Sequence, residues 1–537
     1  MFHIATPLLW RNTTAGALIG LLDFEGVFGR IQDGSIETVN EFLGYKLIGP
    51  LGRFDIYARH AEVLEIYNED LDWSDWHALR READTRSSPL LPKLKAMRFM
   101  ENTSPQHGMT ELKWIRAFAA PGMEELSLTP DDSSTDPGIP YSFASVILRE
   151  LSSRSPKIQV LRFPANDMIT TSSNMITMKG MLTLQHQAAE PWYSHLQCMP
   201  NIRDLTVSDG WLYPPCLGAI GNLPNLTSLS LIPGSYEDCD HDWDIDPESI
   251  QLSTDTFPVL SHLSIDHLPA LTIGKILGLK PMLRGITTLE LEFELNDIDP
   301  WMEELETAMS RLFEGLRNLP YLQRLGIGVH PSLEVEWPVD ISEYLSSMGE
   351  HASLKCVRLR GMCMDPEWCI HKLNLGTIWQ NVEVLIMPTQ PASIRELSLF
   401  ATMPRLKLLV AELNLERPYL PESPNPRHYQ KIVLRSTKEI CLSEDFESLV
   451  LLARALRHLW PKIQGVLWSG ENELVQVALA DYFNYFVLPL RKSYLFGKPR
   501  RGRGHAPKAP EVPERLKLNF HAFMKKIEEI EQLSLAR

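Results

Sequence analysis

Two groups of residues have the right types to bind a metal ion, but neither has the spacing of a known site. The run from Glu237 to Asp246 carries alternating acids, whose oxygens calcium would accept as ligands. Counted from Asp238, the turn position is Trp243 instead of glycine and the closing position is Ser249 instead of glutamate, so the EF-hand pattern fails. We interpret this run as a solvated acidic loop.

The second group contains thiols and imidazoles, which are the ligands that zinc prefers in proteins. Cys363, Cys369 and His371 lie close together, with His351 and Cys356 upstream, but their spacing matches no zinc module. The sequence also has no Gly-x-Ser-x-Gly, no phosphate-binding glycine loop and no His-Glu-x-x-His. We therefore expect no catalytic residue, no metal site and no cofactor, and hence a chain that is not an enzyme.

The composition limits the classes of partner. The 537 residues include 52 Lys and Arg against 68 Asp and Glu, a net charge of −16, which argues against nucleic-acid binding by the chain as a whole. Seven thinly spread cysteines and the absence of a secretion pattern predict reduced thiols in an intracellular protein, cytoplasmic or nuclear. No apolar stretch reaches the roughly 18 residues that span a bilayer, so we expect no membrane partner.

The elements that would position any site come from a recurring phrase: an apolar residue, two variable residues, an apolar residue, one variable residue and an apolar residue. Leu226-Thr-Ser-Leu229-Ser-Leu231 is one copy. Weaker copies lie at Leu64 and at 463–468. The central apolar residues of the eleven clear copies are Met97, Leu126, Leu161, Leu205, Leu229, Leu263, Leu289, Leu325, Val357, Leu385 and Leu409.

The spacing of the copies predicts a solenoid. Successive central residues lie between 24 residues apart (Leu205 to Leu229) and 44 apart (Leu161 to Leu205), enough for one short strand and a return helix. The phrase has strand period, whereas 301–316 has apolar residues three to four apart, as in a helix. We predict an α/β solenoid with a curved parallel sheet on its concave face and helices on its convex face.

This phrase resembles the leucine-rich repeat, in the irregular, helix-backed form found in eukaryotic F-box proteins. The asparagine of that repeat, three positions after the last apolar strand residue, is kept as Asn102 and Asn166 and is missing from most copies. The alternative is a mixed α/β domain that has several leucine-rich strands.

The first residues also resemble an F-box protein. In fungal members the last F-box helix runs through an aromatic residue, a small residue and a proline into Leu-Trp-Arg, and Phe2, Pro7, Leu9 and Trp10 fit that pattern. The resemblance covers only the C-terminal quarter of an F-box, as expected of a late start codon or of a truncated paralogue. The alternative is that Leu-Leu-Trp is the apolar face of a helix that caps the solenoid.

The resemblance implies a function. Such proteins are substrate-recognition subunits of SCF-type cullin-RING ubiquitin ligases, in which the F-box docks on a Skp-family adaptor and the repeats hold a client protein. The chain itself would then do no chemistry but would bring the client close to an enzyme bound elsewhere in the assembly. The alternative is a leucine-rich-repeat binding scaffold that is uncoupled from ubiquitin ligase because most of the F-box is missing.

Strand alternation predicts which side chains would meet a client. The residues between the apolar positions line the concave face, and this face is small and hydroxylated in its middle, with a basic patch later in the chain. A broad, mixed surface suits another protein better than it suits a small substrate. The candidate client-binding residues are Arg98, Arg162, Thr206, Ser230, His262, Ser264, Glu290, Arg324, Arg358 and Arg360.

The C-terminal region differs from the rest of the chain. Residues 491–510 hold seven Lys and Arg and no acid, which would suit a solubilising linker, a nuclear import signal or a nucleic-acid tether. We predict the following organisation: 1–25, F-box remnant or N-terminal cap; 26–470, irregular repeats of about 13 units; 471–490, C-terminal cap; 491–513, basic Pro/Gly-rich linker; 514–537, amphipathic helix.

Overall fold

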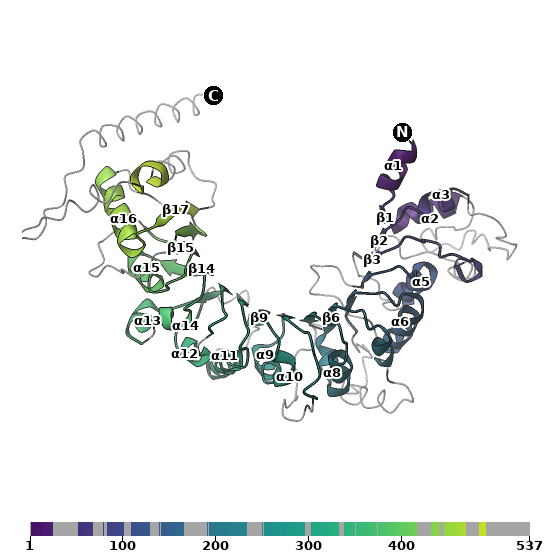
Figure 1. Ribbon diagram of the computed structural model, residues 1–537, viewed down its shortest axis with the longest axis horizontal. Helices are drawn as coiled ribbons and strands as arrows, with labels where there is room; N and C mark the ends of the chain where they lie inside the picture. The colour runs from purple at the N-terminus through teal and green to yellow at the C-terminus, as the bar shows by residue number, and fades with distance from the viewer. Residues whose placement is uncertain are drawn as a thin grey trace, which may run out of the picture. The chain divides into compact units, whose positions relative to one another are not determined.

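The computed structural model divides the chain into two compact units, Met1–Leu268 with Leu279–Ile286, and Pro269–Gly278 with Thr287–Arg537. Each unit is an array of strands and helices that alternate along the chain (Figure 1). The structure describes residues 2–24, 52–67, 79, 83–100, 109–128, 139, 141–165, 191, 193–233, 250, 252–295, 302–331, 338–349, 351–372, 374–415, 431–438, 440, 442, 445–468 and 483–489.

In the first unit each strand pairs in parallel with the next one along the chain. The strands are β1 (Asn12–Thr14), β2 (Val63–Ile66), β3 (Ala96–Phe99), β4 (Glu125–Ser127), β5 (Val160–Phe163), β6 (Asp204–Ser208), β7 (Ser228–Ile232) and β8 (His262–Asp266). The helices are α1 (Phe2–Leu9), α2 (Ala15–Phe24), α3 (Gly52–Ala58), α5 (Met109–Phe118), α6 (Tyr141–Arg154), α8 (Pro214–Gly221) and α10 (Lys280–Leu283).

The second unit repeats this arrangement, with β11 (Val339–Asp340) and β13 (Met362–Cys363) as a separate parallel pair. Its main strands are β9 (Thr288–Leu295), β10 (Arg324–Pro331), β12 (Cys356–Arg360), β14 (Val384–Ala392), β15 (Leu408–Leu413), β16 (Ile432–Ser436) and β17 (Ile463–Trp468). Its helices are α9 (Ala270–Ile276), α11 (Met302–Leu316), α12 (Leu345–Met348), α13 (Pro366–Lys372), α14 (Leu375–Ile378), α15 (Ile394–Phe400), α16 (Phe446–Leu459) and the π-helix η5 (Phe483–Val487).

Strand register confirms the repeat. Every predicted central residue occupies one continuous row within its unit, and all of these side chains are buried. In the first unit the row is Leu64, Met97, Leu126, Leu161, Leu205, Leu229 and Leu263. In the second it is Leu289, Leu325, Val357, Leu385, Leu409, Leu434 and Val466.

Successive turns of the array are also joined by one backbone motif. At the start of β7, the N–H groups of Thr227 and Ser228 both donate to the carbonyl of Arg203, at 2.8 and 2.9 Å. In the second unit Glu383 and Val384 donate to Lys355 in the same way, at 2.8 and 3.0 Å. These hydrogen bonds tie the start of a strand to the start of the preceding strand and so set its register. The register is kept from turn to turn although the helices vary in length.

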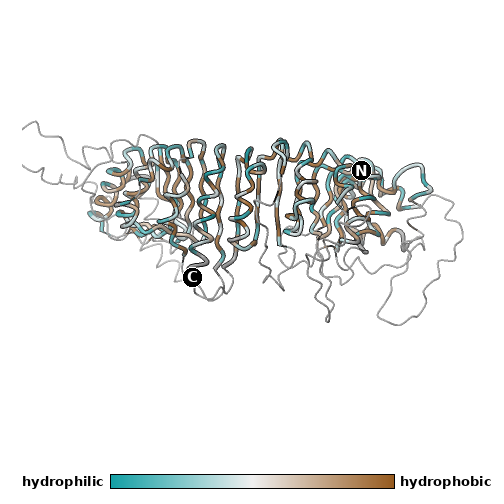
Figure 2. Tube along the Cα trace, turned by 90° about the horizontal axis from the view of Figure 1, so that it is seen from below, coloured by the Kyte–Doolittle hydropathy of each residue, from teal (hydrophilic) through white to brown (hydrophobic). Residues whose placement is uncertain are grey.

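The helices of each unit lie on one side of its strands, as seen for α5, α6 and α8 and for α11, α13 and α15 (Figure 1). Apolar stretches alternate with hydrophilic turns along both units (Figure 2). The fold is thus a leucine-rich-repeat solenoid of the α/β class, as predicted, with 15 parallel strands in its main array among the described residues. We call the sheet face away from the helices the open face.

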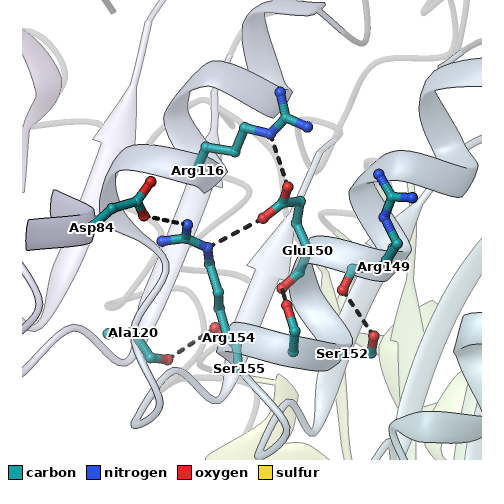
Figure 3. A network of polar contacts seen from close by, with 9 residues as sticks. Asp84, Arg116, Ala120, Arg149, Glu150, Ser152, Arg154 and Ser155 are labelled. Atoms are coloured by element: carbon teal, nitrogen blue, oxygen red, sulfur yellow. Dashed lines mark hydrogen bonds and ion pairs between the residues drawn. The ribbon is translucent and has the colours of Figure 1, made fainter. Parts of the chain in front are cut away.

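Ion pairs on the helix side fasten neighbouring helices of the first unit. Glu150 of α6 accepts from Arg116 of α5 at 3.0 Å and from Arg154 at 3.2 Å, and Arg154 also reaches Asp84 at 2.7 Å (Figure 3). Beneath them the buried Ser155 hydroxyl donates to the Ala120 carbonyl at 2.9 Å. This network joins three turns of the array, and its contacts are all between residues of the scaffold.

The array extends beyond the predicted phrase at two strands. In β1 the central position is Thr13, which is 6% exposed and pairs with Leu64, so the first strand lies inside the predicted cap at 1–25. In β16 the central Leu434 is present, but Lys431 and Ser436 replace the apolar residues at either end of the phrase. Ser436 is fully buried because its hydroxyl accepts a hydrogen bond from the Leu413 amide at 3.2 Å.

The predicted linker at 491–513 and helix at 514–537 lie outside the described residues. So do Asn102, Asn166 and the acidic run at 237–246. Within the described part of the chain, the longest apolar helices are too short to cross a bilayer, and none of them qualifies as a membrane span.

Candidate functional site

On the open face of the first unit, the predicted residues form one row. Register aligns Arg98, Arg162, Thr206, Ser230 and Ser264 through Ser127, and it places His262 in the adjacent row beside Ser228. Thr206, Ser230 and His262 are half-buried by their neighbours. Small hydroxyl side chains therefore make up most of this surface.

Two of these candidates are occupied by contacts within the unit. Arg98 makes a two-point ion pair with Glu125 on the next strand, at 2.7 Å from Nε to Oε1 and 3.0 Å from Nη2 to Oε2. The hydrogen bonds that Arg98 donates to the Glu125 carboxylate raise the pKa of its guanidinium. Ser264 is only 7% exposed, and its hydroxyl donates to Asp266 Oδ1 at 3.1 Å. The charge of Arg98 is therefore compensated by Glu125, and the hydroxyl proton of Ser264 is used by Asp266.

The open face of the second unit divides the predicted basic patch. Arg360 is paired with Glu292, two strands away, and His330 also lies 3.1 Å from the same carboxylate. Arg324 and Arg358 are exposed, and no residue within the described ranges forms a hydrogen bond or ion pair with either side chain. Only two of the three predicted arginines therefore carry an uncompensated charge.

A glycine on the strand between them lets the side chains of Arg360 and Glu292 meet. Register places Gly328 between Glu292 and Arg360, and Gly326 between Glu290 and Arg358. A Cβ atom at Gly328 would lie 3.4 Å from Glu292 Cγ, so the glutamate side chain leans over this strand. Gly326 and Gly328 have no side chains, so β10 adds no bulk to the open face between the glutamates of β9 and the arginines of β12.

Farther along the second unit the open face becomes apolar and then basic again. Register places Arg358, Ile386, Val410 and Arg435 side by side on four consecutive strands of the array. We call these four residues the arginine-flanked row. Leu467, which is 52% exposed, continues it beside Arg435. The sequence phrase did not predict Arg435, because its strand lacks the apolar ends of the repeat.

The N-terminal helix presents two apolar side chains to solvent. Leu8 is 72% exposed and Leu9 is 74% exposed at the end of α1. Trp10, by contrast, stacks on Tyr57, with ring centroids 4.7 Å apart, and Pro7 is half-buried. Of the predicted adaptor residues, Leu9 is therefore free to meet a partner, Trp10 helps to attach α1 to the array, and the side chain of Phe2 lies outside the described set.

The cysteine and histidine group does not form a site. Cys369 is buried with its Sγ 3.6 Å from Ser342 Oγ, and burial raises the pKa of Cys363 to about 11, which keeps that thiol protonated. His351 is buried with Nε2 3.1 Å from the Met348 carbonyl, and burial lowers its pKa. In the part of the chain that the structure describes, no group of three or more potential ligands could hold a metal ion.

No family model matches this chain, and no curated protein matches it. Among solved structures the chain is similar to one in the "Crystal structure of TLR13-ssRNA13 complex", with 13% sequence identity and a TM-score of 0.34. The match covers 77% of this chain and 51% of that chain, so this chain spans about half of its length. The assignment of the fold therefore depends on the strand register and the buried central rows.

Proposed function

We propose that this chain is a protein-interaction module and serves as the substrate-recognition subunit of an SCF-type cullin-RING ubiquitin ligase. The client polypeptide would lie on the open face, and the chain itself would catalyse no reaction. The observation that carries the proposal is the arginine-flanked row, where unpaired exposed cations stand beside half-buried apolar side chains.

This combination suits a protein partner. Exposed arginines and apolar side chains on an open sheet face offer many shallow contacts, whereas an enzyme for a small molecule needs a deep pocket with a few converging polar groups. Holding a client in this way raises its local concentration near an enzyme bound elsewhere. We place this activity inside the cell, in the cytoplasm or the nucleus.

The adaptor side of the proposal is supported by α1. An exposed Leu8 and Leu9 would gain from burial against another protein, and the stacking of Trp10 on Tyr57 joins the end of α1 to α3. The expected partner is a Skp-family adaptor. A leucine-rich-repeat scaffold without ligase coupling is the second candidate, because the residues that resemble an F-box cover only its last helix.

Retention of a purified Skp-family adaptor by the immobilised full-length chain tests the ligase proposal. We expect retention, and we expect Leu8→Glu with Leu9→Glu to weaken it by about tenfold or more, since a charge would replace buried apolar contact. Val259→Glu and Tyr321→Glu, which alter residues 46% and 60% exposed elsewhere, are matched controls and should retain the adaptor normally.

Failure of the unmodified chain to retain the adaptor would contradict the ligase proposal and favour the second candidate, a binding scaffold without ligase coupling. Equal losses in the control variants would show that the binding is unspecific, which also counts against it.

A further inference from the structure

We propose that the arginine-flanked row binds an extended polypeptide segment with the pattern acid, any residue, apolar residue, any residue, acid. This inference rests on the proposed function only in that the open face holds a partner polypeptide. It does not depend on the adaptor or on the ligase.

The four side chains lie in line across the sheet. Arg358 is in register with Ile386, Ile386 with Val410, and Val410 with Arg435. The preceding residue on β12, β14 and β15 belongs to the buried central row, so these side chains point to the open face. Three steps between neighbouring strands, at about 4.8 Å each, place the two arginines roughly 14 Å apart.

The charges at the ends of the row select an anion. Arg358 and Arg435 are both exposed, and none of the residues that the structure describes pairs with either guanidinium. Arg360, only two residues beyond Arg358, is already neutralised by Glu292. In a chain of net charge −16, two unpaired arginines in one row are a local departure, and guanidinium groups bind carboxylates with two parallel hydrogen bonds.

The middle of the row selects an apolar side chain. Ile386 and Val410 are half-buried, and the adjacent row continues the apolar strip with Val384, Leu408 and Val433. A nucleic-acid backbone would place charged phosphates over this strip and leave it unmatched. A polypeptide can present carboxylates to both arginines and a leucine or isoleucine between them, so we favour a polypeptide.

The distance between the arginines favours an extended segment. At about 3.3 Å per residue, four residues span roughly 13 Å, and side chains at positions one, three and five point to the same side. The third side chain then falls midway, above Ile386 and Val410. A helix returns to the same face after seven residues or eleven, which is about 10.5 or 16.5 Å, so it fits the spacing less well. The pattern reads the same in both chain directions.

Fluorescence anisotropy of a labelled peptide with the full-length chain tests the proposal. The probe contains Glu-Thr-Leu-Thr-Glu between Gly-Ser flanks, because threonine favours the extended conformation. We expect Arg358→Gln or Arg435→Gln to raise the dissociation constant about fivefold each and the double variant about twentyfold. Arg149→Gln with Arg284→Gln removes two exposed positive charges from the first unit, outside its strands, so it controls for net charge and should leave the affinity unchanged.

Changes in the probe test the pattern. Replacing both glutamates by glutamine, or moving them to flank the leucine directly, should each weaken binding by about tenfold. The proposal is overturned if these probes bind as well as the first, or if no peptide binds up to about 1 mM. It is also overturned if the unit 1 variant loses affinity as strongly as the unit 2 variant, or if a single-stranded oligonucleotide binds with the same dependence on both arginines.

Thermal unfolding of each variant, followed by circular dichroism, separates lost binding from lost folding. Both arginines are exposed and unpaired within the described residues, so their replacement should leave the transition in place. Failure of the adaptor experiment with success of this one would remove the ligase and keep the binding surface. The reverse result would remove the surface alone.

Discussion

The two units have the same core but different open faces. In both, the central row is an unbroken line of buried apolar side chains, apart from Thr13 in β1. The open face of the first unit carries hydroxyl side chains and an arginine paired with Glu125, whereas that of the second carries glycines, unpaired arginines and an apolar strip. The repeat therefore fixes the scaffold and leaves the outward positions free to differ, and the partner surface should follow that difference.

The largest expected effect tests whether the central rows of the two units contribute equally to stability. Leu229→Ala in the first unit and Leu385→Ala in the second each remove a fully buried side chain from the central row, and each should cost about 3 kcal/mol of unfolding free energy. Urea denaturation followed by circular dichroism measures both. A loss in one unit of less than about 1 kcal/mol would break the equivalence of the two rows.

The next largest effect is a loss of stability on replacing glycine by alanine, which should differ between two glycines of the second unit. Gly361 has a φ of +68°, and a Cβ atom there would lie 2.1 Å from the Val329 carbonyl oxygen. Gly361→Ala should therefore cost about 2 kcal/mol or more in unfolding free energy. At Gly326 the nearest atom to an added Cβ is Glu290 Cγ at 3.6 Å, so Gly326→Ala should be close to neutral. Equal losses of unfolding free energy at Gly361 and Gly326 would show that the fold requires glycine at the outward position Gly326 as well.

Acid should weaken the second unit through His351. Burial lowers the pKa of this histidine from 6.5, so below pH 6.5 the unfolded chain binds a proton that the folded chain does not. Its contribution to stability is complete above pH 6.5 and is lost as the pH falls through the lower folded pKa. His351→Gln should flatten the dependence of the urea midpoint on pH below pH 6.5. An unchanged slope in this variant would assign the dependence to other groups.

The smallest effects concern the ion pairs on the open faces. Arg98→Ala and Arg360→Ala each remove a partly exposed pair, so each should cost less than about 1 kcal/mol of unfolding free energy. Only Arg360→Ala should also weaken the acidic peptide, by roughly twofold, because it leaves the Glu292 carboxylate on the same face. Peptide anisotropy and urea denaturation report the two effects separately, and a peptide effect from Arg98→Ala would contradict the account.

Much of the scaffold could be predicted because the central row depends on local apolar alternation. Met97 or Val357 can be placed in the core from its own phrase without knowledge of any partner strand. The strand that contains Arg435 could not be found in this way, because Lys431 and Ser436 stand where the phrase needs apolar residues. Ser436 is buried only because an amide on the neighbouring strand donates to it, and the phrase carries no record of that contact.

The open face was harder to predict than the core. Arg324, Arg358 and Arg360 look alike in the sequence, but only Arg360 meets Glu292, which lies 68 residues earlier. That contact depends on Gly328 in the strand between them. Charge compensation across strands is a property of the register, and pattern alone therefore identified the cations but not which of them are free.

The central claim is that a polypeptide partner lies on the open face of the second unit. Photo-crosslinking tests it most directly: a photoreactive leucine analogue replaces the leucine of the acidic peptide, and the crosslinked residue is mapped by proteolysis and mass spectrometry on the full-length chain. The account predicts crosslinks on β14 and β15, at or next to Ile386 and Val410. Crosslinks concentrated on the strands of the first unit, or on the helices of either unit, would contradict it.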